Sequence, residues 1–487
     1  MRVGIIGAGP AGLTAAYQLI KAGIHVDVFE ETSVIGGMCR TINMWNQRVD
    51  LGPHRFFTHD ARVRTLWEEV VGSDFAMVQR LTRILYNDAL FFYPLKPLDT
   101  LRKLGPVEAA VCVLSYMRRR LAGSNWPYKR NLKNHSGCPV QELPRESFED
   151  WVIERFGRRL FEMFFKTYSE KLWGMPCSEL DADFSAQRIR RFSLWEAIKN
   201  AFFVGGDYAD SKWKHSTLLD QFAYPHLGSG AAFERMGTAI EKRGGRIFCS
   251  TPVCRVVSEG KKAIGVQLAD GTVKRYDQVV STMSLPTLVE GLSGVPDEVR
   301  ACAAALHFRQ TILVYLLVAA DDLFPDNWLY VHSKNLKTGR ITNFRNWTPH
   351  LYGEDNRSVV VLEYWDDQGR KNPAETVGDD AHRIATAIQD FQESGFLGES
   401  LILDASVYRL DRSYPIYRKG YKEVLQPVER YLQSISGLSV IGRGGAFKYN
   451  NQDHSMLMGL LAAENLTGVA QHDLWSVNTD YGEYQEK

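Results

Sequence analysis

The spacing of apolar residues changes along the chain, and these changes predict its elements. A short apolar run at residues 3–6 predicts a buried strand, a three-to-four spacing up to about Ala22 predicts a helix, and His25–Phe29 predicts a second strand. The spacing is helical again over most of residues 100–204. Shorter runs predict a hairpin at 83–93 that turns near Asn87, strands at 246–249, 253–257, 263–268, 279–282, 310–317, 357–364, 405–409 and near 440, and helices that end near 240 and 466. This mixture predicts an α/β fold.

Three glycines follow the first strand at the G-x-G-x-x-G spacing of a dinucleotide-binding turn. Gly7 allows the tight turn, Gly9 lets the backbone approach a pyrophosphate, and Gly12 lets the helix pack on the strand. Glu30 ends the second strand, where a carboxylate can accept hydrogen bonds from a ribose. Because strand, turn, helix, strand and acid occur in order, the sequence predicts a dinucleotide at the helix N-terminus, beside Gly7, Gly9, Ala11 and Gly12.

A second glycine pair, Gly36 and Gly37, is followed closely by Arg40, whose guanidinium can reach phosphate or flavin edges. Together the two motifs predict FAD rather than NAD. At this point the chain resembles the large family of flavoproteins that includes amine oxidases, protoporphyrinogen oxidase, carotenoid desaturases and UDP-galactopyranose mutase. The resemblance implies a Rossmann-type (GR2-like) FAD-binding domain that is discontinuous in sequence, with a mainly helical insertion and a mixed β-sheet substrate domain.

The order of the predicted elements gives the expected domain boundaries. We expect the FAD-binding domain at residues 1–75, 222–288 and 432–470, the helical insertion at 76–221, and the β-sheet substrate domain at 289–431. Residues 471–487 are polar and are expected to form a loose tail.

Composition adds limits on partners and location. A net charge of +1, from 58 basic and 57 acidic residues, argues against nucleic acid as a partner. Seven cysteines without a Cys-x-x-Cys motif, and no signal peptide before the first strand, lead us to expect a cytoplasmic protein. Pro106–Met117 is apolar but too short to span a membrane, and it ends in three arginines. We expect a core helix there; peripheral membrane contact and homo-oligomerisation stay open.

Later segments resemble the UDP-galactopyranose mutases in particular. Val49–Thr58 resembles the mutase segment that carries a glycine-flanked histidine beside the flavin, which implies that role for His54. Residues 165–174 resemble the stretch before the mutases' mobile substrate loop, 327–349 resemble the eukaryotic mutases, and 440–456 resemble the run that closes over the flavin.

The mutase resemblance implies a set of site residues. The implied catalytic residues are His54, Arg188, Arg340 and Tyr414, with the two arginines clamping the substrate diphosphate. The implied flavin contacts are Gly442, Arg443, Asp453, Ser455 and the backbone of Val253. The implied substrate contacts are Phe57, Tyr93, Lys96, Trp173, Trp328, Tyr330, Trp347 and Tyr417.

Three functions are open on the sequence alone. The first is a mutase-like flavoenzyme that interconverts the pyranose and furanose forms of a nucleotide sugar. In that family reduced flavin N5 attacks the anomeric carbon, NAD(P)H or another reductant supplies the electrons, and no net redox change results. The second is an FAD-dependent oxidase or desaturase acting on an amine, porphyrinogen or polyene, and the third is a flavoprotein partner without enzymatic activity.

The sequence contains no Ser/His/Asp or metal-ligand constellation, and the first function needs neither. Pocket substitutions, such as Arg418 at a mutase asparagine, leave the sugar and the nucleotide open.

Overall fold

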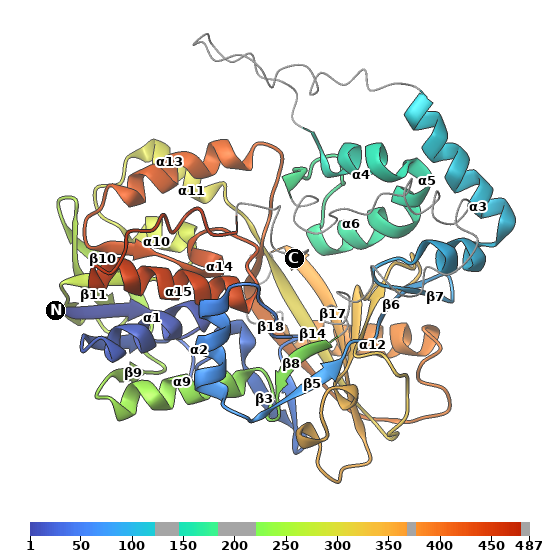
Figure 1. Cartoon of the computed structure of the whole chain (residues 1–487), viewed down its shortest axis with the longest axis horizontal. Coiled ribbons are helices and arrows are strands. Elements are labelled where there is room, and N and C mark those ends of the chain that lie inside the picture. Colours follow the sequence, from blue (N-terminus) through green and yellow to red (C-terminus); the bar gives the residue numbers. More distant parts are fainter. Residues whose placement is uncertain (122–145, 184–220, 368–375, 479–487) are drawn as a thin grey trace.

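The structure is a computed structural model of the chain, and it describes residues 1–121, 146–183, 221–367 and 376–478. Figure 1 shows three groups of elements: a parallel sheet covered by helices on the left, a group of helices at the upper right, and a large sheet at the lower right. This α/β arrangement confirms the predicted fold class.

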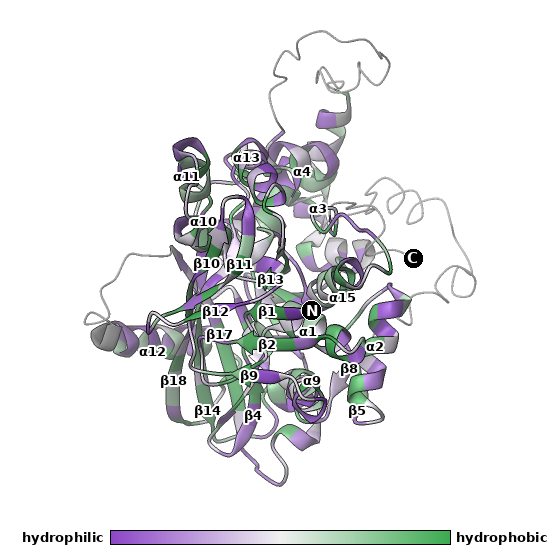
Figure 2. Ribbon diagram, turned by 90° about the vertical axis from the view of Figure 1, so that its left-hand side faces the viewer, coloured by the Kyte–Doolittle hydropathy of each residue, from purple (hydrophilic) through white to green (hydrophobic). Residues whose placement is uncertain are grey.

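A five-stranded parallel sheet carries the first glycine motif, with its strands in the order β19-β13-β1-β2-β9. The strands are β1 (Arg2–Ile6), β2 (His25–Phe29), β9 (Arg246–Phe248), β13 (Gln278–Ser281) and β19 (Leu438–Val440). They come from three distant parts of the chain, as the predicted discontinuity requires. Figure 2 shows β1 and β2 as largely hydrophobic ribbons, which is usual for parallel strands covered on both faces.

Helices and a small antiparallel sheet surround this parallel sheet. They are α1 (Pro10–Lys21), α2 (Ala61–Val71), α9 (Gly230–Lys242), α10 (Leu285–Gly291), α11 (Asp297–Ala304), α13 (Tyr421–Gln433), α14 (Gly442–Gly445), α15 (Gln452–Thr467), and the strands β10 (Val253–Glu259), β11 (Lys262–Leu268) and β12 (Val273–Arg275). Helices α1 and α15 cross closely, because a Cβ on Gly459 would lie 2.4 Å from the carbonyl oxygen of Ala11. Residues 440–456, called the C-terminal motif below, are therefore held against α1.

The large sheet has seven strands in the order β18-β14-β17-β16-β15-β6-β7. Its bounds are β6 (Thr82–Tyr86), β7 (Ala89–Phe92), β14 (Phe308–Val318), β15 (Trp328–Val331), β16 (Arg340–Asn343), β17 (Ser358–Asp367) and β18 (Ile402–Pro415). It is mixed, as predicted, because β6 and β15 are parallel while the other neighbours are antiparallel. Successive side chains along each strand point to opposite faces of this sheet. Val314 and Leu362 pack in the cluster that includes residues of α12 (Thr376–Glu393), whereas Tyr315 and Val361 lie in another cluster on the opposite face.

The predicted hairpin is confirmed, but it belongs to the sheet. Asn87 and Asp88 form the turn with φ of 45° and 62°, and β6 and β7 extend the seven-stranded sheet, although the expected partition placed them in the helical insertion. The described remainder of that insertion is mostly helical. It comprises α3 (Pro97–Leu121), α4 (Phe148–Phe156), α5 (Arg158–Phe161), a π-helical turn (Glu162–Lys166) and α6 (Thr167–Trp173), together with part of β8 (Gln221–Pro225), which pairs with β5 (Phe75–Gln79).

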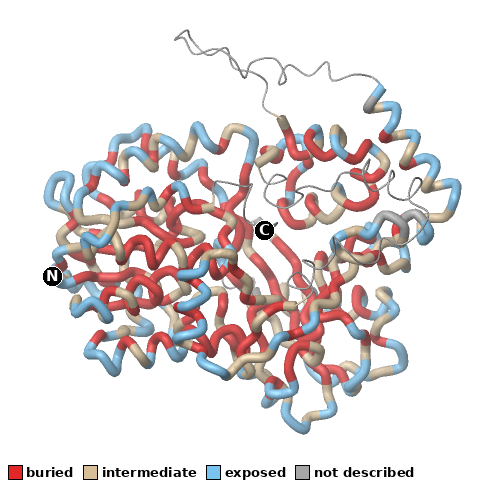
Figure 3. Tube along the Cα trace, viewed as in Figure 1, coloured by how far each residue is buried: buried red, intermediate tan, exposed pale blue. Residues whose placement is uncertain are grey.

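The expectation of a loose tail is wrong for residues 471–478. Trp475 and Val477 are buried in the main core, and the Lys448 ammonium donates hydrogen bonds to the carbonyls of both. An aromatic and an aliphatic side chain inside a polar stretch gain enough burial to fix it. Figure 3 shows the same core as the buried interior of the left-hand sheet and its helices. In the part of the chain that the structure describes, no helix has the length and apolar character needed to cross a bilayer.

One buried aspartate links the seven-stranded sheet to β8 and to the start of α9. Asp50, at the end of β4 (Gln47–Asp50, paired with β3, Thr41–Met44), accepts hydrogen bonds from Thr41 Oγ1 (2.5 Å), Tyr224 OH (2.8 Å) and the N–H of Ser229 (3.1 Å). The hydroxyl of Tyr315 on β14 donates to the carbonyl oxygen of Asp50 (2.9 Å). Burial raises the pKa of Asp50 to about 7, although these hydrogen bonds oppose the shift.

We expect Asp50→Asn to reduce the pH dependence of stability. The folded-state pKa of about 7 lies above the ordinary value of 3.8, so the folded state binds the proton more tightly. The resulting stabilisation is complete below pH 3.8 and is lost as the pH rises through 7. This group should lower the free energy of unfolding by on the order of 1 kcal/mol per pH unit across that interval. Urea unfolding across that pH range would measure it, with Asp321→Asn at an exposed site as the control. An unchanged pH slope in Asp50→Asn would contradict the assignment.

Candidate functional site

The turn between β1 and α1 has the geometry that its glycines predict. Gly7 has a φ of +95°, and a Cβ there would lie 2.0 Å from Thr282 Oγ1; a Cβ on Gly12 would lie 2.0 Å from the carbonyl oxygen of Gly7. Gly9 precedes α1 and supplies no side-chain cap. The first N–H groups of the helix can therefore bind an anion such as a pyrophosphate.

Glu30 holds this turn to the next loop. Its buried carboxylate accepts hydrogen bonds from the N–H of Ala8 (2.8 Å), the N–H of Thr32 (3.0 Å) and Thr32 Oγ1 (2.7 Å). The N–H of Thr251 donates to the carbonyl oxygen of Glu30 (2.8 Å), which places the start of β10, at Val253, near the same end of the sheet. The expected ribose contact, Glu30, and the expected adenine contact, Val253, thus come from neighbouring segments.

The second glycine pair lies directly against the first turn. The N–H of Gly36 donates to the carbonyl of Ala8 (2.8 Å), and a Cβ on Gly37 would lie 3.0 Å from the Cα of Gly9. Arg40 donates from Nε to the carbonyl of Gly37 (2.8 Å) and from Nη1 to Thr32 Oγ1 (3.0 Å). Arg40 therefore braces this loop, a protein contact that the sequence motif alone does not indicate.

The C-terminal motif closes the same region from the other side. Gly442 has a φ of +86°, and a Cβ there would lie 3.3 Å from the Cβ of Ala11. Asp453 and Ser455 are buried in the first turn of α15, and burial raises the pKa of Asp453 to about 7. The glycine turn, the loop and the motif around Asp453 together fit an extended dinucleotide.

Three catalytic candidates meet where the seven-stranded sheet faces this motif. Arg340 on β16 donates from Nη2 to Glu363 on β17 and to the hydroxyl of Tyr414 on β18 (3.3 Å). The guanidinium carbon of Arg443 lies 4.5 Å from the ring centres of both Tyr414 and Tyr449. Tyr414 therefore connects the two arginines.

His54 is close to both cations and is held neutral. Burial lowers the pKa of His54 to about 3, and the charges of Arg340 and Arg443 act in the same direction. Its buried Nδ1 has no hydrogen-bond partner among the described residues. A neutral imidazole beside two guanidinium groups can donate or accept one hydrogen bond without adding charge.

Glu363 is a site residue that the sequence analysis missed. A Cβ on Gly52 would lie 3.3 Å from Glu363 Oε1, and this oxygen has no hydrogen-bond partner in the described part of the chain. Burial raises the pKa of Glu363 above its ordinary value, although the charge and the hydrogen bond of Arg340 oppose the shift. An acidic residue inside the otherwise apolar run Val359–Trp365 was the signal that could have found it.

Aromatic side chains from several segments line the same region. The ring centres of Tyr93 and Tyr330 lie 4.9 Å apart, and Trp173 lies 6.1 Å from Tyr414. Two further rings were not predicted: Tyr168 lies 5.4 Å from Tyr330, and Trp365 lies 6.0 Å from Tyr168. The expected substrate contacts Tyr93, Trp173 and Tyr330 are thus brought together.

Two more arginines lie beside this group. Arg55 follows His54, and its guanidinium carbon lies 5.7 Å from the ring centre of Phe57. Arg80 has a buried Nε without a hydrogen-bond partner among the described residues. Neither arginine forms an ion pair within those residues, so the region has more positive than negative side chains.

The remaining expected contacts pack against other protein groups or are exposed. The rings of Trp328 and Trp347, 5.7 Å apart, pack in a buried cluster with Phe222 and Tyr224. Lys96 is exposed, 4.5 Å from the ring centre of Phe92, and the hydroxyl of Tyr417 accepts a hydrogen bond from the N–H of Tyr449 (2.8 Å). Tyr417 therefore supports the closing segment, and Arg188 lies outside the described residues.

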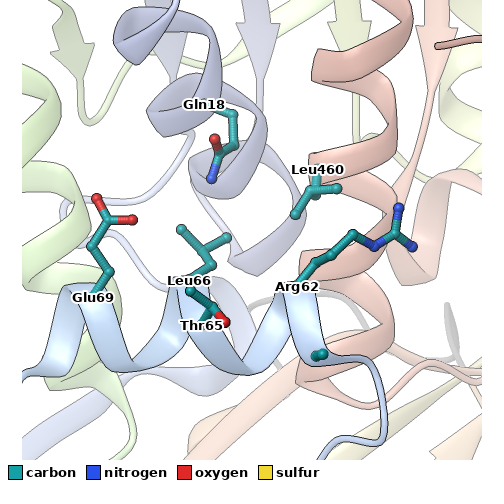
Figure 4. A pocket seen from close by; sticks show the side chains of 7 residues that line it. Gln18, Arg62, Thr65, Leu66, Glu69 and Leu460 are labelled. Carbon is teal, nitrogen blue, oxygen red and sulfur yellow. The ribbon is translucent and has the colours of Figure 1, made fainter. Parts of the chain in front are cut away.

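A surface groove of about 370 Å³ lies between α1, α2 and α15, away from this site (Figure 4). Its charged lining residues are already paired: Glu69 accepts from Lys21 (2.7 Å), and Arg62 donates to Asp60 (2.8 Å). Within the described ranges, no group of three or more His, Cys, Asp or Glu residues is placed to hold a metal ion.

Comparisons with known proteins agree with this geometry. The model of a family described as flavin containing amine oxidoreductase matches residues 10–395. A solved structure of reduced UDP-galactopyranose mutase superposes with a TM-score of 0.80 at 21% identity, covering 98% of each chain. Phytoene desaturase from Fusarium fujikuroi is 24% identical over 58% of this chain and 49% of its own length. A probable UDP-galactopyranose mutase from Klebsiella pneumoniae is 27% identical over 41% of this chain and 48% of its own. The chain thus spans about half the length of the curated relatives it matches.

We expect Glu30→Gln to weaken FAD binding. The amide cannot accept all three hydrogen bonds of the carboxylate, so the turn above α1 should loosen. If Glu30 also accepts a charge-assisted hydrogen bond of about 1.5–3 kcal/mol from the ribose, its loss corresponds to roughly ten- to a hundred-fold weaker binding. The flavin content and the FAD dissociation constant of the purified variant would measure the effect. Glu31→Gln, at the exposed neighbouring residue, is the matched control. Equal flavin affinity in both variants would remove Glu30 from the cofactor site.

Proposed function

Because this chain belongs to the family of flavin-containing amine oxidoreductases, we propose that it is a flavoenzyme that interconverts the pyranose and furanose forms of a nucleotide sugar. Its cofactor is FAD. The observation that carries the proposal is the meeting of Arg340, Tyr414 and Arg443 beside the C-terminal flavin motif. Two guanidinium groups that converge on one tyrosine suit a diphosphate better than a hydrocarbon.

The buried donors in this region support an anionic ligand. The Nε atoms of Arg80, Arg340 and Arg443 are buried and have no hydrogen-bond partners among the described residues. A polyene bound against them would leave all three without a partner, and each unsatisfied group costs about 1–3 kcal/mol. Phosphate oxygens would accept hydrogen bonds from them, so a nucleotide sugar fits the donors that the site presents.

The residues divide the work between holding charge and excluding water. Reduced flavin, when bound, supplies an electron-rich ring nitrogen that can attack carbon. Arg340 and Arg443 would hold the diphosphate as negative charge develops on it, and Tyr414 would keep the two guanidinium groups in position. Neutral His54 would hydrogen bond at the flavin without repelling the arginines. Tyr93, Tyr168 and Tyr330 would close the region against water.

An oxidase or desaturase is the second candidate. The family description and the similarity to a phytoene desaturase favour it. It differs from the first candidate in electron balance, because each turnover would remove two electrons from the substrate. The two candidates therefore predict opposite dependence on the initial redox state.

Turnover should require reduced FAD and should consume no further reductant. The experiment is anaerobic incubation of dithionite-reduced protein with UDP-galactose and other nucleotide sugars, followed by separation of the pyranose and furanose products. Oxidised protein under the same conditions is the control, and we expect it to be inactive. Oxidised protein that converts its substrate while peroxide accumulates in step with product would instead establish the oxidase.

Removing the Arg340–Glu363 pair should weaken binding of the nucleotide. The double variant Arg340→Gln/Glu363→Gln avoids leaving one buried charge without its partner. We expect the affinity for UDP to fall about ten- to a hundred-fold. Arg340→Lys should also bind UDP weakly, because an ammonium lacks the paired, planar N–H donors of a guanidinium. Perturbation of the flavin absorbance would measure binding.

The matched control for this experiment is Arg83→Gln/Asp326→Asn. Arg83 donates from Nε to Asp326 Oδ1 (2.8 Å), and the pair is partly buried like the test pair but involves neither Tyr414 nor Arg443. It should leave UDP affinity unchanged. Equal loss of affinity in both double variants would attribute the effect to general destabilisation and would remove Arg340 from the diphosphate site.

A further inference from the structure

Helix α3 (Pro97–Leu121) lies at the outer edge of the molecule, at the far right of Figure 1. Gly105, with a φ of +80°, divides it, and Pro106 begins the second part. This second part runs to Leu121 and corresponds to the apolar stretch with a basic end that the proposed enzymatic function does not use.

Two polar side chains of this second part, Glu108 and Ser115, point toward the protein. Glu108 pairs with Arg159, and Ser115 Oγ accepts a hydrogen bond from the N–H of Arg159 (3.2 Å). Cys112 and Tyr116 on the same side are buried. A Cβ on Gly157 would lie 2.9 Å from the N atom of Tyr116, so the contact with the start of α5 is close. This side is therefore the packed side of the helix.

The side of α3 that faces solvent is apolar. Its large side chains recur at intervals of three or four residues, and Val107 is 77%, Leu114 60% and Leu121 86% exposed. The α3 apolar face consists of Val107, Val111, Leu114, Met117 and Leu121. The other exposed large aliphatic side chains in the described ranges are scattered over several elements. A helix with its acid turned inward and a continuous apolar stripe turned outward needs a partner surface.

Basic residues flank the stripe at both ends. Arg102 is exposed before the kink, and Arg118 is exposed beside Met117, with Arg119 next to it. None of these arginines forms an ion pair with a described residue. The only acidic residue in the second part, Glu108, is neutralised by Arg159. The exposed surface from Val107 to Leu121 is thus mostly apolar, with arginines before it and in its last turn, on a protein whose net charge is only +1.

From this arrangement we propose that α3 docks the protein on an anionic phospholipid bilayer, with the α3 apolar face at the level of the acyl chains and Arg102, Arg118 and Arg119 at the headgroups. A helix at the edge of the molecule presents a convex surface, which a deformable bilayer can accept along its whole length. The basic ends match negative headgroups, whereas a second copy of α3 would bring the same positive ends together. The enzyme would thereby act at a membrane surface that it contacts through this helix.

The test is flotation of the full-length, FAD-loaded protein with vesicles of phosphatidylcholine alone or mixed with phosphatidylglycerol. We expect the wild-type protein to bind the anionic vesicles at least tenfold more tightly. Val111→Glu/Leu114→Glu should reduce binding to both vesicles at least tenfold. Arg118→Gln/Arg119→Gln should mainly remove the preference for anionic lipid, by about fivefold for each arginine.

The matched control is Val273→Glu/Leu401→Glu, which places two acids at exposed apolar sites on other elements. It should bind vesicles like the wild type, and flavin content should show that every variant is folded. The proposal fails if wild-type protein binds neither vesicle, or if the control variant loses binding equally. It also fails if light scattering shows a dimer that Val111→Glu/Leu114→Glu converts to a monomer, because a second copy would then cover the face. None of these outcomes depends on catalytic turnover, so they leave the proposed enzymatic function to its own test.

Discussion

The candidate site depends on how the seven-stranded sheet is held against β8 and α9, and Asp50 is hydrogen-bonded on both sides of that contact. Its side chain is bound by Thr41, Tyr224 and the start of α9, while its backbone carbonyl is bound by Tyr315 of the large sheet. The following residues run directly to His54, so this network also positions the histidine. A buried acid with three donors is costly to rearrange, because any displacement would leave a polar group without its partner. The geometry of the cofactor and substrate regions is therefore coupled through one residue.

The distribution of charge then distinguishes the two regions. Near the first glycine turn, Glu30 and Arg40 are both occupied by hydrogen bonds to the protein, and they shape a backbone surface. Across from it, the guanidinium groups of Arg340 and Arg443 retain buried donors without partners among the described residues. The first region is complete as a scaffold, while the second lacks acceptors that a ligand would supply. Binding energy for a substrate would thus concentrate in the second region.

Local sequence signals predicted the fold well and the substrate region only in part. The glycines at 7 and 12 and the Asn87 turn were predictable because backbone conformation at these positions permits few alternatives. Glu363 and Arg80 were missed because their importance comes from neighbours far away in the sequence. Trp328 and Trp347 were assigned by resemblance to the substrate region, but packing with Phe222 determines where their rings lie. The packing of residues 471–478 against the core depends on hydrogen bonds from the distant Lys448, which no local pattern indicates.

The scaffold alone cannot choose between isomerisation and oxidation, because both chemistries begin with a flavin held in the same way. The choice depends on what stabilises charge next to the flavin. An oxidase of hydrocarbons needs an apolar wall, whereas expulsion of a diphosphate needs fixed cations that do not have to reorganise. Here Arg443 lies against two tyrosine rings and Arg340 is bound to Glu363, so both cations are already oriented. Cations oriented in advance would stabilise negative charge that develops beside them, and on this ground we propose a leaving diphosphate rather than a hydrocarbon substrate.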